Sequence, residues 1–169
     1  SSEFPKTFSD YFSFIAELSR HLPMVETEQG LDHWPNIYCG TFVILLFFLY
    51  LFNKRITLRE KAVYITLAIV FLASFAVNVL NFIWHGFHYP NSLPARQSFI
   101  YIFLIVFMCF RVYDNLDSVS KRDTGAAFGM AFASVLIAQE LIKDDAFGFG
   151  VFYMAMLLTA VYAGLIHIY

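Results

Sequence analysis

The sequence has few charged residues. Asp, Glu, Lys and Arg make up only 14% of its 169 residues, whereas 59% are hydrophobic and 20% are aromatic. A soluble domain usually contains about 25% charged residues. The composition therefore argues against a soluble domain and indicates a membrane protein. The formal net charge of -2 carries little information, because in membrane proteins the placement of charges matters more than their sum.

Cysteine is also scarce, and the chain contains only Cys39 and Cys109. A disulfide needs two Cα atoms within about 7 Å of each other. In the topology derived below, the two residues fall at opposite faces of the membrane. We therefore expect no disulfide between them, and the cysteines say nothing about the redox compartment.

Several signals that would place the chain in another class are missing. It has no initiator Met, no basic amino-terminal region and no signal-peptide cleavage site. It also has no P-loop and no dinucleotide-binding glycine pattern, and we expect no nucleic acid among its partners. Five spans without a complete soluble domain suggest that Ser1 begins an excerpt from a longer chain.

Long apolar runs predict an all-α fold, a multispanning transmembrane helix bundle of about five spans. A helix needs about 20 apolar residues to cross the hydrocarbon core of a bilayer. The predicted spans are residues 37–52, 62–80, 98–113, 124–142 and 146–169. The first and third spans are short, so interfacial residues must complete their crossing.

Residues 1–36, which precede the first span, are polar and mixed in character. Apolar residues such as Phe12, Ile15 and Leu18 recur at helical spacing. This pattern predicts a short amphipathic helix that lies on the membrane or packs on the bundle. We expect the whole segment to be an extracytoplasmic loop.

The basic residues predict the orientation of the spans. The loops after the first and third spans, with their flanks, hold Lys54, Arg55, Arg59, Lys61, Arg111, Lys121 and Arg122. The loop after the second span has only Arg96, and the loop after the fourth has only Lys143. By the positive-inside rule the first pair of loops is cytoplasmic. The 78–98 loop is then extracytoplasmic, in a multi-pass membrane protein.

The 78–98 stretch lies between two apolar runs and holds a varied set of polar side chains. Asn78 and Asn81 lie three residues apart near the end of a span, so they direct one polar edge into the bundle. Such side chains either join helices or line a pocket. Pro90 and Pro94 restrict the backbone of the loop that follows. We expect this stretch to be the functional centre of the chain.

Arg96 is the only cation of the outer loop between the second and third spans. A guanidinium near the membrane surface suits a phosphate or a carboxylate, because it donates two parallel hydrogen bonds. The alternatives are an anchor to lipid headgroups, or an ion pair with Glu140, Asp144 or Asp145. Gln97 follows it directly and belongs to the same candidate site.

His85 and His88 are three residues apart, and on a helix they would share one face. Two histidines at this spacing can bind zinc, but a third ligand is present only if the loop with Asp32 and His33 comes close. A hydrogen-bonding or proton-transfer role is the second reading. Packing at the membrane interface, alongside Trp84 and Tyr89, is the third.

Four longer motifs of the sequence resemble those of a known protein family. They read LNFIWHGFHYPN at 80–91, LPARQSF at 93–99, WPNIYCG at 34–40 and ITLREK at 56–61. Together they resemble the YfhO family of bacterial membrane proteins. The resemblance implies a large multispanning protein of the plasma membrane of Gram-positive bacteria. The family is similar to the GT-C glycosyltransferases, which use sugars linked to a polyprenyl phosphate such as undecaprenyl phosphate on the outer face of the membrane.

The resemblance also implies roles for residues of the 78–98 stretch. The acceptor would be a cell-wall polymer, lipoteichoic or wall teichoic acid, and Arg96 would stabilise the phosphate of the leaving carrier. The substrate-binding candidates are Arg96, Asn81, Trp84, Tyr89, Asn91 and Gln97. The local candidates for a catalytic base are Asp32, His85 and His88. No metal ligands are assigned, no cofactor is certain, and a divalent metal is left open.

Two departures from the family pattern bear on this transfer of roles. The carboxylate that GT-C enzymes carry in their first outer loop is expected upstream of Ser1. The family often has an aromatic residue where this chain has Ala95. Two other functions are therefore kept beside the enzyme: a transporter or flippase for a lipid-linked sugar, and a structural subunit of a cell-envelope complex.

Overall fold

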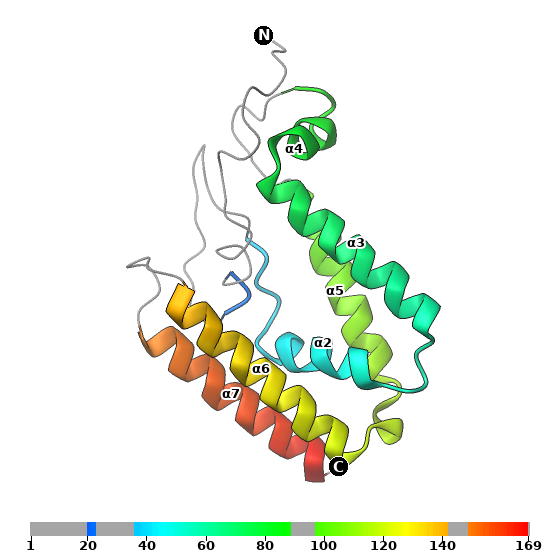
Figure 1. The fold of residues 1–169 in the computed structure, drawn as a ribbon, viewed down its shortest axis with the longest axis vertical. Coiled ribbons are helices and arrows are strands. Elements are labelled where there is room, and N and C mark those ends of the chain that lie inside the picture. The colour runs from blue at the N-terminus through cyan, green and yellow to red at the C-terminus, as the bar shows by residue number, and fades with distance from the viewer. Residues whose placement is uncertain (1–19, 23–35, 89–96, 142–148, 169) are drawn as a thin grey trace.

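The computed structural model describes residues 20–22, 36–88, 97–141 and 149–168, and these residues form helices joined by short connections (Figure 1). The prediction of an all-α protein is confirmed for this part of the chain, which contains no strand. The helices are α2 (Phe42–Phe52), α3 (Leu58–Ala76), α4 (Asn78–Trp84), α5 (Ser98–Tyr113), the 3₁₀ helix η1 (Leu116–Ser118), α6 (Lys121–Leu141) and α7 (Phe149–Ile168).

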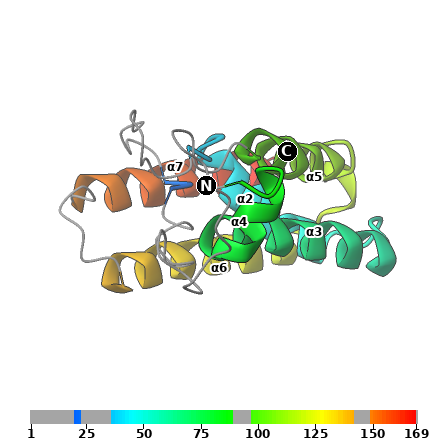
Figure 2. The ribbon, with the colours of Figure 1, turned by 90° about the horizontal axis from the view of Figure 1, so that it is seen from above.

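Helix α2 lies at the centre of the molecule and packs against α5, α6 and α7 (Figures 1 and 2). Leu45, Leu49 and Tyr50 on this helix are 0% exposed. Within the predicted span 37–52, the helix covers Phe42–Phe52 only. The backbone at Gly40 has φ +108°, a left-handed value that interrupts a helix. At 1.5 Å per residue, α2 is about 16 Å long, roughly half the hydrocarbon thickness.

The other helices form two groups, one on either side of α2. Helix α3 packs on α5 and carries α4 at its end, while α6 and α7 pack on each other along their length. A continuous apolar core joins α2 to α3 and α5, and a smaller cluster that includes Val135 and Phe152 lies between α6 and α7. The central helix therefore connects two helical halves.

Helix α3 begins and ends with clear local signals. The Thr57 hydroxyl accepts a hydrogen bond from the Glu60 backbone N–H at 3.2 Å, which caps the amino terminus. At the other end Val77 is extended (φ −95°, ψ 115°), and α4 leaves at an angle of 101°. The Ser74 hydroxyl donates to the Phe71 carbonyl at 2.6 Å, and such bonds from Ser to the helix backbone favour bends. The predicted span 62–80 is thus divided at Val77.

The number of membrane spans can be compared with the helix lengths. Among the described residues, α7 is the one helix that is by itself long and apolar enough to cross a membrane, and the bent pair α3–α4 is a second if it counts as one span. Helix α5 covers the residues of the predicted span 98–113 but has only 16 residues. The five-span arrangement stays a prediction, and the amphipathic helix within 1–36 lies outside the described residues.

The outer faces of the helices are strongly apolar. Phe103 on α5 is 71% exposed, Leu157 on α7 is 59% exposed and Val63 on α3 is 50% exposed. Many other large apolar side chains of these helices are also exposed, and extensive exposed apolar surface marks contact with a membrane or a partner. The surface is the kind that a membrane protein presents to lipid.

Candidate functional site

Four polar side chains are buried where α3 breaks and α5 begins. Ser74, Asn78, Asn81 and Gln97 are 0 to 4% exposed. We call these four residues the amide cluster. Gln97 Nε2 donates to Ser74 Oγ at 3.1 Å and lies 3.4 Å from the Ser74 carbonyl oxygen. That carbonyl is one of the last four of α3, which have no partner within a straight helix, so the Gln97 side chain ties α5 to the break.

Two oxygens of the amide cluster are buried without a hydrogen-bond partner among the described residues. They are Asn81 Oδ1 and Gln97 Oε1. A buried amide oxygen that loses its hydrogen bond to water costs about 1–3 kcal/mol. Both atoms are acceptors only, so they suit a ligand that brings hydroxyl or N–H donors.

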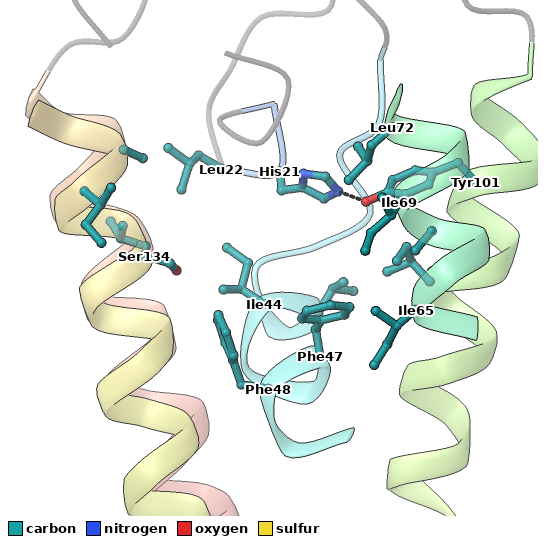
Figure 3. Close-up of a pocket in the computed structure, with 16 residues that line it drawn as sticks. His21, Leu22, Ile44, Phe47, Phe48, Ile65, Ile69, Leu72, Tyr101 and Ser134 are labelled. Carbon is teal, nitrogen blue, oxygen red and sulfur yellow. Dashed lines mark hydrogen bonds between the residues drawn. The ribbon is translucent and has the colours of Figure 1, made fainter. Parts of the chain in front are cut away.

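Tyr101 lies one helical turn after Gln97 on α5, and a histidine from an earlier part of the chain meets it there. Tyr101 Oη and His21 Nε2 are 3.0 Å apart (Figure 3). The Tyr101 ring also meets the Phe75 ring edge to face, with 5.9 Å between centroids. Sequence reasoning missed both Tyr101 and His21. The position of Tyr101, four residues after Gln97, gave a signal for Tyr101, but nothing marked a contact with a residue 80 positions away.

Sequence reasoning missed two further residues of this region. Ser74 is four residues before Asn78 and seven before Asn81, so it extends the same polar face by one turn and could have been found from that spacing. Arg20, next to His21 in the chain, is 4% exposed. A buried guanidinium is rare unless it is paired. Arg20 lies in a segment of mixed polar character, and nothing in that segment indicated that its side chain would be buried.

Trp84 ends α4 with its ring partly open to the surroundings. It is 44% exposed, and its ring centroid lies 5.3 Å from that of Phe71 with an interplanar angle of 31°. One part of the ring therefore packs on α3, while the rest is accessible. An accessible aromatic face beside a polar cluster suits a flat apolar surface such as one side of a sugar ring.

His85 and His88 do not lie on a helix, so the condition under which they would share one face is not met. Helix α4 ends at Trp84, and both Gly86 (φ 68°) and Phe87 (φ 63°) have left-handed backbone. His85 Nδ1 donates to the Asn81 carbonyl at 2.8 Å, and His88 Nδ1 donates to the Gly86 carbonyl at 2.9 Å. Each histidine thus holds its own turn rather than facing the other.

Four of the predicted site residues fall in parts of the chain that the structure does not describe. Asp32, Tyr89, Asn91 and Arg96 lie outside the described residues. In the described ranges no three His, Cys, Asp or Glu side chains come close enough to hold a metal ion. Of the predicted site residues, Asn81 lies on α4 one turn after the break at Val77 and Gln97 bonds Ser74 just before it, and both are buried.

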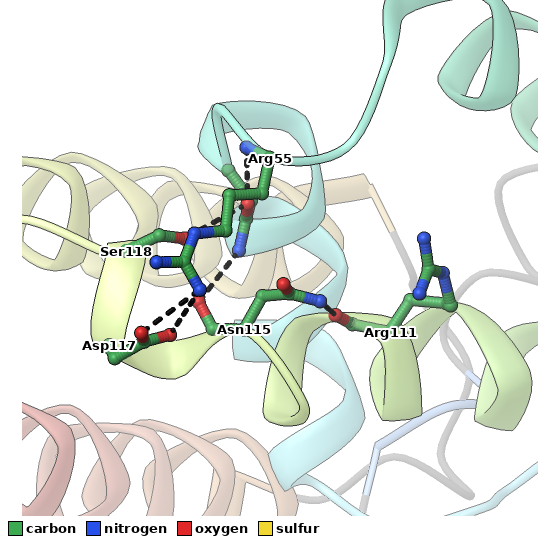
Figure 4. Close-up of polar contacts among 6 residues, drawn as sticks. Arg55, Arg111, Asn115, Asp117 and Ser118 are labelled. Carbon is green, nitrogen blue, oxygen red and sulfur yellow. Dashed lines mark hydrogen bonds and ion pairs between the residues drawn. The ribbon is translucent and has the colours of Figure 1, made fainter.

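The opposite ends of α3 and α5 carry a second polar network, which we call the basic-end network. Asn53 is 1% exposed; its Nδ2 donates to the Asn115 carbonyl at 3.2 Å. Its Oδ1 accepts from the Arg55 backbone N–H at 2.9 Å and from Ser118 Oγ at 3.2 Å. Arg55 also pairs with Asp117 at 2.9 Å (Figure 4). These bonds join the α2–α3 loop to the α5–α6 loop.

Two further contacts tie α3 to its neighbours near this end. Arg111 on α5 binds Glu60 on α3 through two bonds, of 2.9 and 3.2 Å. Lys61 Nζ donates to the Leu51 carbonyl in the last turn of α2 at 2.7 Å. The two loops that the basic residues assign to one side of the membrane are therefore held together in the fold.

These features define the class of the protein: a helical membrane protein with an apolar outer surface and a buried polar cluster at one end of its helices. The family model described as bacterial membrane protein YfhO matches residues 1–168. The chain belongs to this family, as the motifs of its sequence predict. Searches of curated proteins and of solved structures gave no match.

Proposed function

We propose that the chain is part of a membrane glycosyltransferase of the GT-C type. It takes a sugar from a polyprenyl-phosphate carrier and adds it to lipoteichoic or wall teichoic acid on the outer face of the plasma membrane. In this orientation the amide cluster faces outward and the basic-end network faces the cytoplasm. The positive-inside rule supports that orientation, because the two loops joined by the network carry most of the Lys and Arg residues.

The observation that carries the proposal is the pair of buried acceptors, Asn81 Oδ1 and Gln97 Oε1. A sugar presents several hydroxyl donors on a compact ring, and each can satisfy one acceptor. Sites built to bind a hydroxyl discriminate strongly against analogues that lack it. The exposed part of the Trp84 ring supplies an apolar surface beside these acceptors, and Tyr89 and Asn91 follow it in the chain.

The reaction assigns a role to each remaining candidate. An acceptor hydroxyl attacks the anomeric carbon, the bond from that carbon to the phosphate oxygen breaks, and the polyprenyl phosphate leaves with the electron pair. A base takes the hydroxyl proton; Asp32, His85 and His88 are the candidates in this chain. Arg96 stabilises the charge that develops on the phosphate.

A transporter or flippase for the same lipid-linked sugar is the second candidate. The 101° break between α3 and α4 supports it, because secondary transporters bind substrates at interrupted helices. Such folds carry two broken helices in corresponding positions of two repeats, and the described residues contain one. This difference favours the transferase.

Purified full-length protein tests the proposal. It is mixed with a polyprenyl-phosphate sugar and teichoic acid in vesicles, and both sugar transfer and lipid movement are measured. Transfer supports the enzyme, whereas lipid movement without transfer supports the transporter. A protein that does neither but binds a separate catalytic protein is a structural subunit.

Substitution of Arg96 tests the proposed transfer mechanism most directly in this assay. Arg96→Ala should lower transfer by about 10²–10³-fold, the range found when one charge-stabilising donor is removed. Arg96→Lys should keep part of the activity, because a lysine supplies the charge without the two parallel bonds. Thermal unfolding of both variants should match the unmodified protein. Full activity in Arg96→Ala would remove this residue from the mechanism.

A further inference from the structure

An apolar cleft runs along one face of α2, between α6 on one side and α3 with α5 on the other (Figure 3). Its volume is about 400 Å³. The floor is formed by Ile44, Phe47 and Phe48 of α2, and nearly all of the lining is hydrocarbon. The size is that of an ordinary ligand pocket, but the lining has few of the polar groups that orient a polar ligand.

The edges of the cleft lie on the outer surface of the molecule. Ile69 on α3 and Ile137 on α6 both line it, and they are 52% and 58% exposed. Neighbouring residues of the same outer faces, Val70 and Leu136, are also exposed. The cleft is thus continuous with the apolar surface that a member of this membrane-protein family presents to lipid. An occupant can enter sideways from the bilayer without crossing water.

The cleft also separates the two halves of the fold. The main contacts between them pass through α2, which packs on α5 to one side and on α6 and α7 to the other. Atoms that line a space without packing partners lose dispersion contacts on that side. A hydrocarbon chain in the cleft would restore those contacts and bridge α3 to α6.

One end of the cleft is polar. His21 and Tyr101 lie there, joined by their 3.0 Å hydrogen bond, whereas Phe47, Phe48 and Ile65 line the other end (Figure 3). A lipid has the same polarity along its length, with hydrogen-bonding ester groups at the head of an apolar chain. The polar end also lies one turn from Gln97, on the side of the amide cluster.

We infer that the cleft holds one acyl chain of a membrane phospholipid, with its ester end beside His21 and Tyr101. A phospholipid is the expected occupant because the mouth opens on the hydrocarbon of the bilayer, where phospholipid is the abundant component and fills a site by mass action. This lipid joins the two halves of the fold. The inference goes beyond the proposed function and does not require sugar transfer.

Lipid retention tests the inference. The full chain is purified in mild detergent, and bound lipid is quantified by mass spectrometry. The unmodified protein should keep phospholipid, and Ala138→Phe, which places a ring in the cleft, should lower the amount about tenfold, as for a loss of about 1.4 kcal/mol of binding free energy. The matched control is Ala126→Phe, at an exposed position of α6 outside the cleft, and it should keep the unmodified amount.

A second measurement needs no variant and decides the question if Ala138→Phe fails to fold. Phosphatidylglycerol added to delipidated protein should raise the unfolding temperature, and its chain-free headgroup, glycerophosphoglycerol, should not. Equal stabilisation by both compounds, equal lipid retention in the two variants, or retention of isoprenoid lipid in place of phospholipid would each overturn the inference. Because none of these readouts measures transfer, they are independent of the enzyme assay.

Discussion

Each end of the described molecule buries an asparagine, and the two differ in what their side chains bond. Asn53, at the basic end, uses both atoms of its amide, which contacts Asn115, Arg55 and Ser118. Asn81, at the other end, has an Oδ1 without a partner among the described residues. A buried amide whose bonds are complete joins parts of the fold. A buried amide with an open acceptor gains no such connection, and under the proposed function that acceptor receives a sugar hydroxyl.

The largest stability effect is expected from Asn53→Leu. Leucine has a similar shape but removes three hydrogen bonds of the basic-end network. The Ser118 hydroxyl still donates to the Asn115 carbonyl at 2.7 Å, so the Arg55 backbone N–H is the group that loses its acceptor, and one unsatisfied group costs about 1–3 kcal/mol. We therefore expect a loss of about 1–3 kcal/mol. Thermal unfolding in detergent measures it, and an unfolding temperature like that of the unmodified protein would show that the network does not hold the loops together.

The same substitution at the other end, Asn81→Leu, should have the opposite pattern. It removes an acceptor that has no partner in the described fold, so stability should change by less than about 1 kcal/mol. Sugar transfer should fall about 10–100-fold, because a sugar hydroxyl loses its partner. Asn53→Leu is the control for a purely structural effect. If Asn81→Leu lowers the unfolding temperature as much as Asn53→Leu does, the comparison between the two ends fails.

The sequence predicted the parts of this comparison that depend on local pattern. Apolar runs predicted the all-α fold, and the placement of Lys and Arg grouped the two loops that the basic-end network joins. The motifs predicted the family. Asn81 and Gln97 were expected to line a pocket, and both are buried at the break, but a role in binding stays a prediction.

Other features could not be predicted, for physical reasons. No proline or glycine marks the break at Val77, and the Ser74 hydroxyl, whose bond to the helix backbone favours a bend, could equally have faced a neighbouring helix. The turn at Gly86 and Phe87 depends on left-handed backbone at a non-glycine residue, which is uncommon. Pairing of His21 with Tyr101 depends on how distant segments pack, and a pattern along one chain does not contain that information.

A smaller effect is expected from Glu60→Gln, which tests whether charge or amide bonding holds the basic end. The Glu60 and Arg111 side chains are 21% and 33% exposed, and ion pairs that water reaches contribute about 0–1 kcal/mol. We expect a loss of less than about 1 kcal/mol that becomes smaller in high salt. Unfolding temperatures at two salt concentrations measure it. A loss larger than that of Asn53→Leu would mean that the ion pair, rather than the amide, is the main bond at this end.

The smallest effect concerns pH at the start of α6, beside the basic-end network. Ser120 Oγ donates to Asp123 Oδ2 at 2.6 Å, and this bond lowers the pKa of the Asp123 carboxyl below its usual range. A carboxyl with a lowered pKa in the folded state stabilises the fold fully above its unfolded pKa, and the contribution is lost as pH falls through the folded pKa. Asp123 is only partly buried, so solvent screening limits the effect to a few tenths of a kcal/mol. The unfolding temperature should therefore fall slightly more below about pH 4 in the unmodified protein than in Asp123→Asn, which has no carboxyl to titrate. Identical pH curves would mean that the Ser120 bond does not distinguish the two protonation states of Asp123.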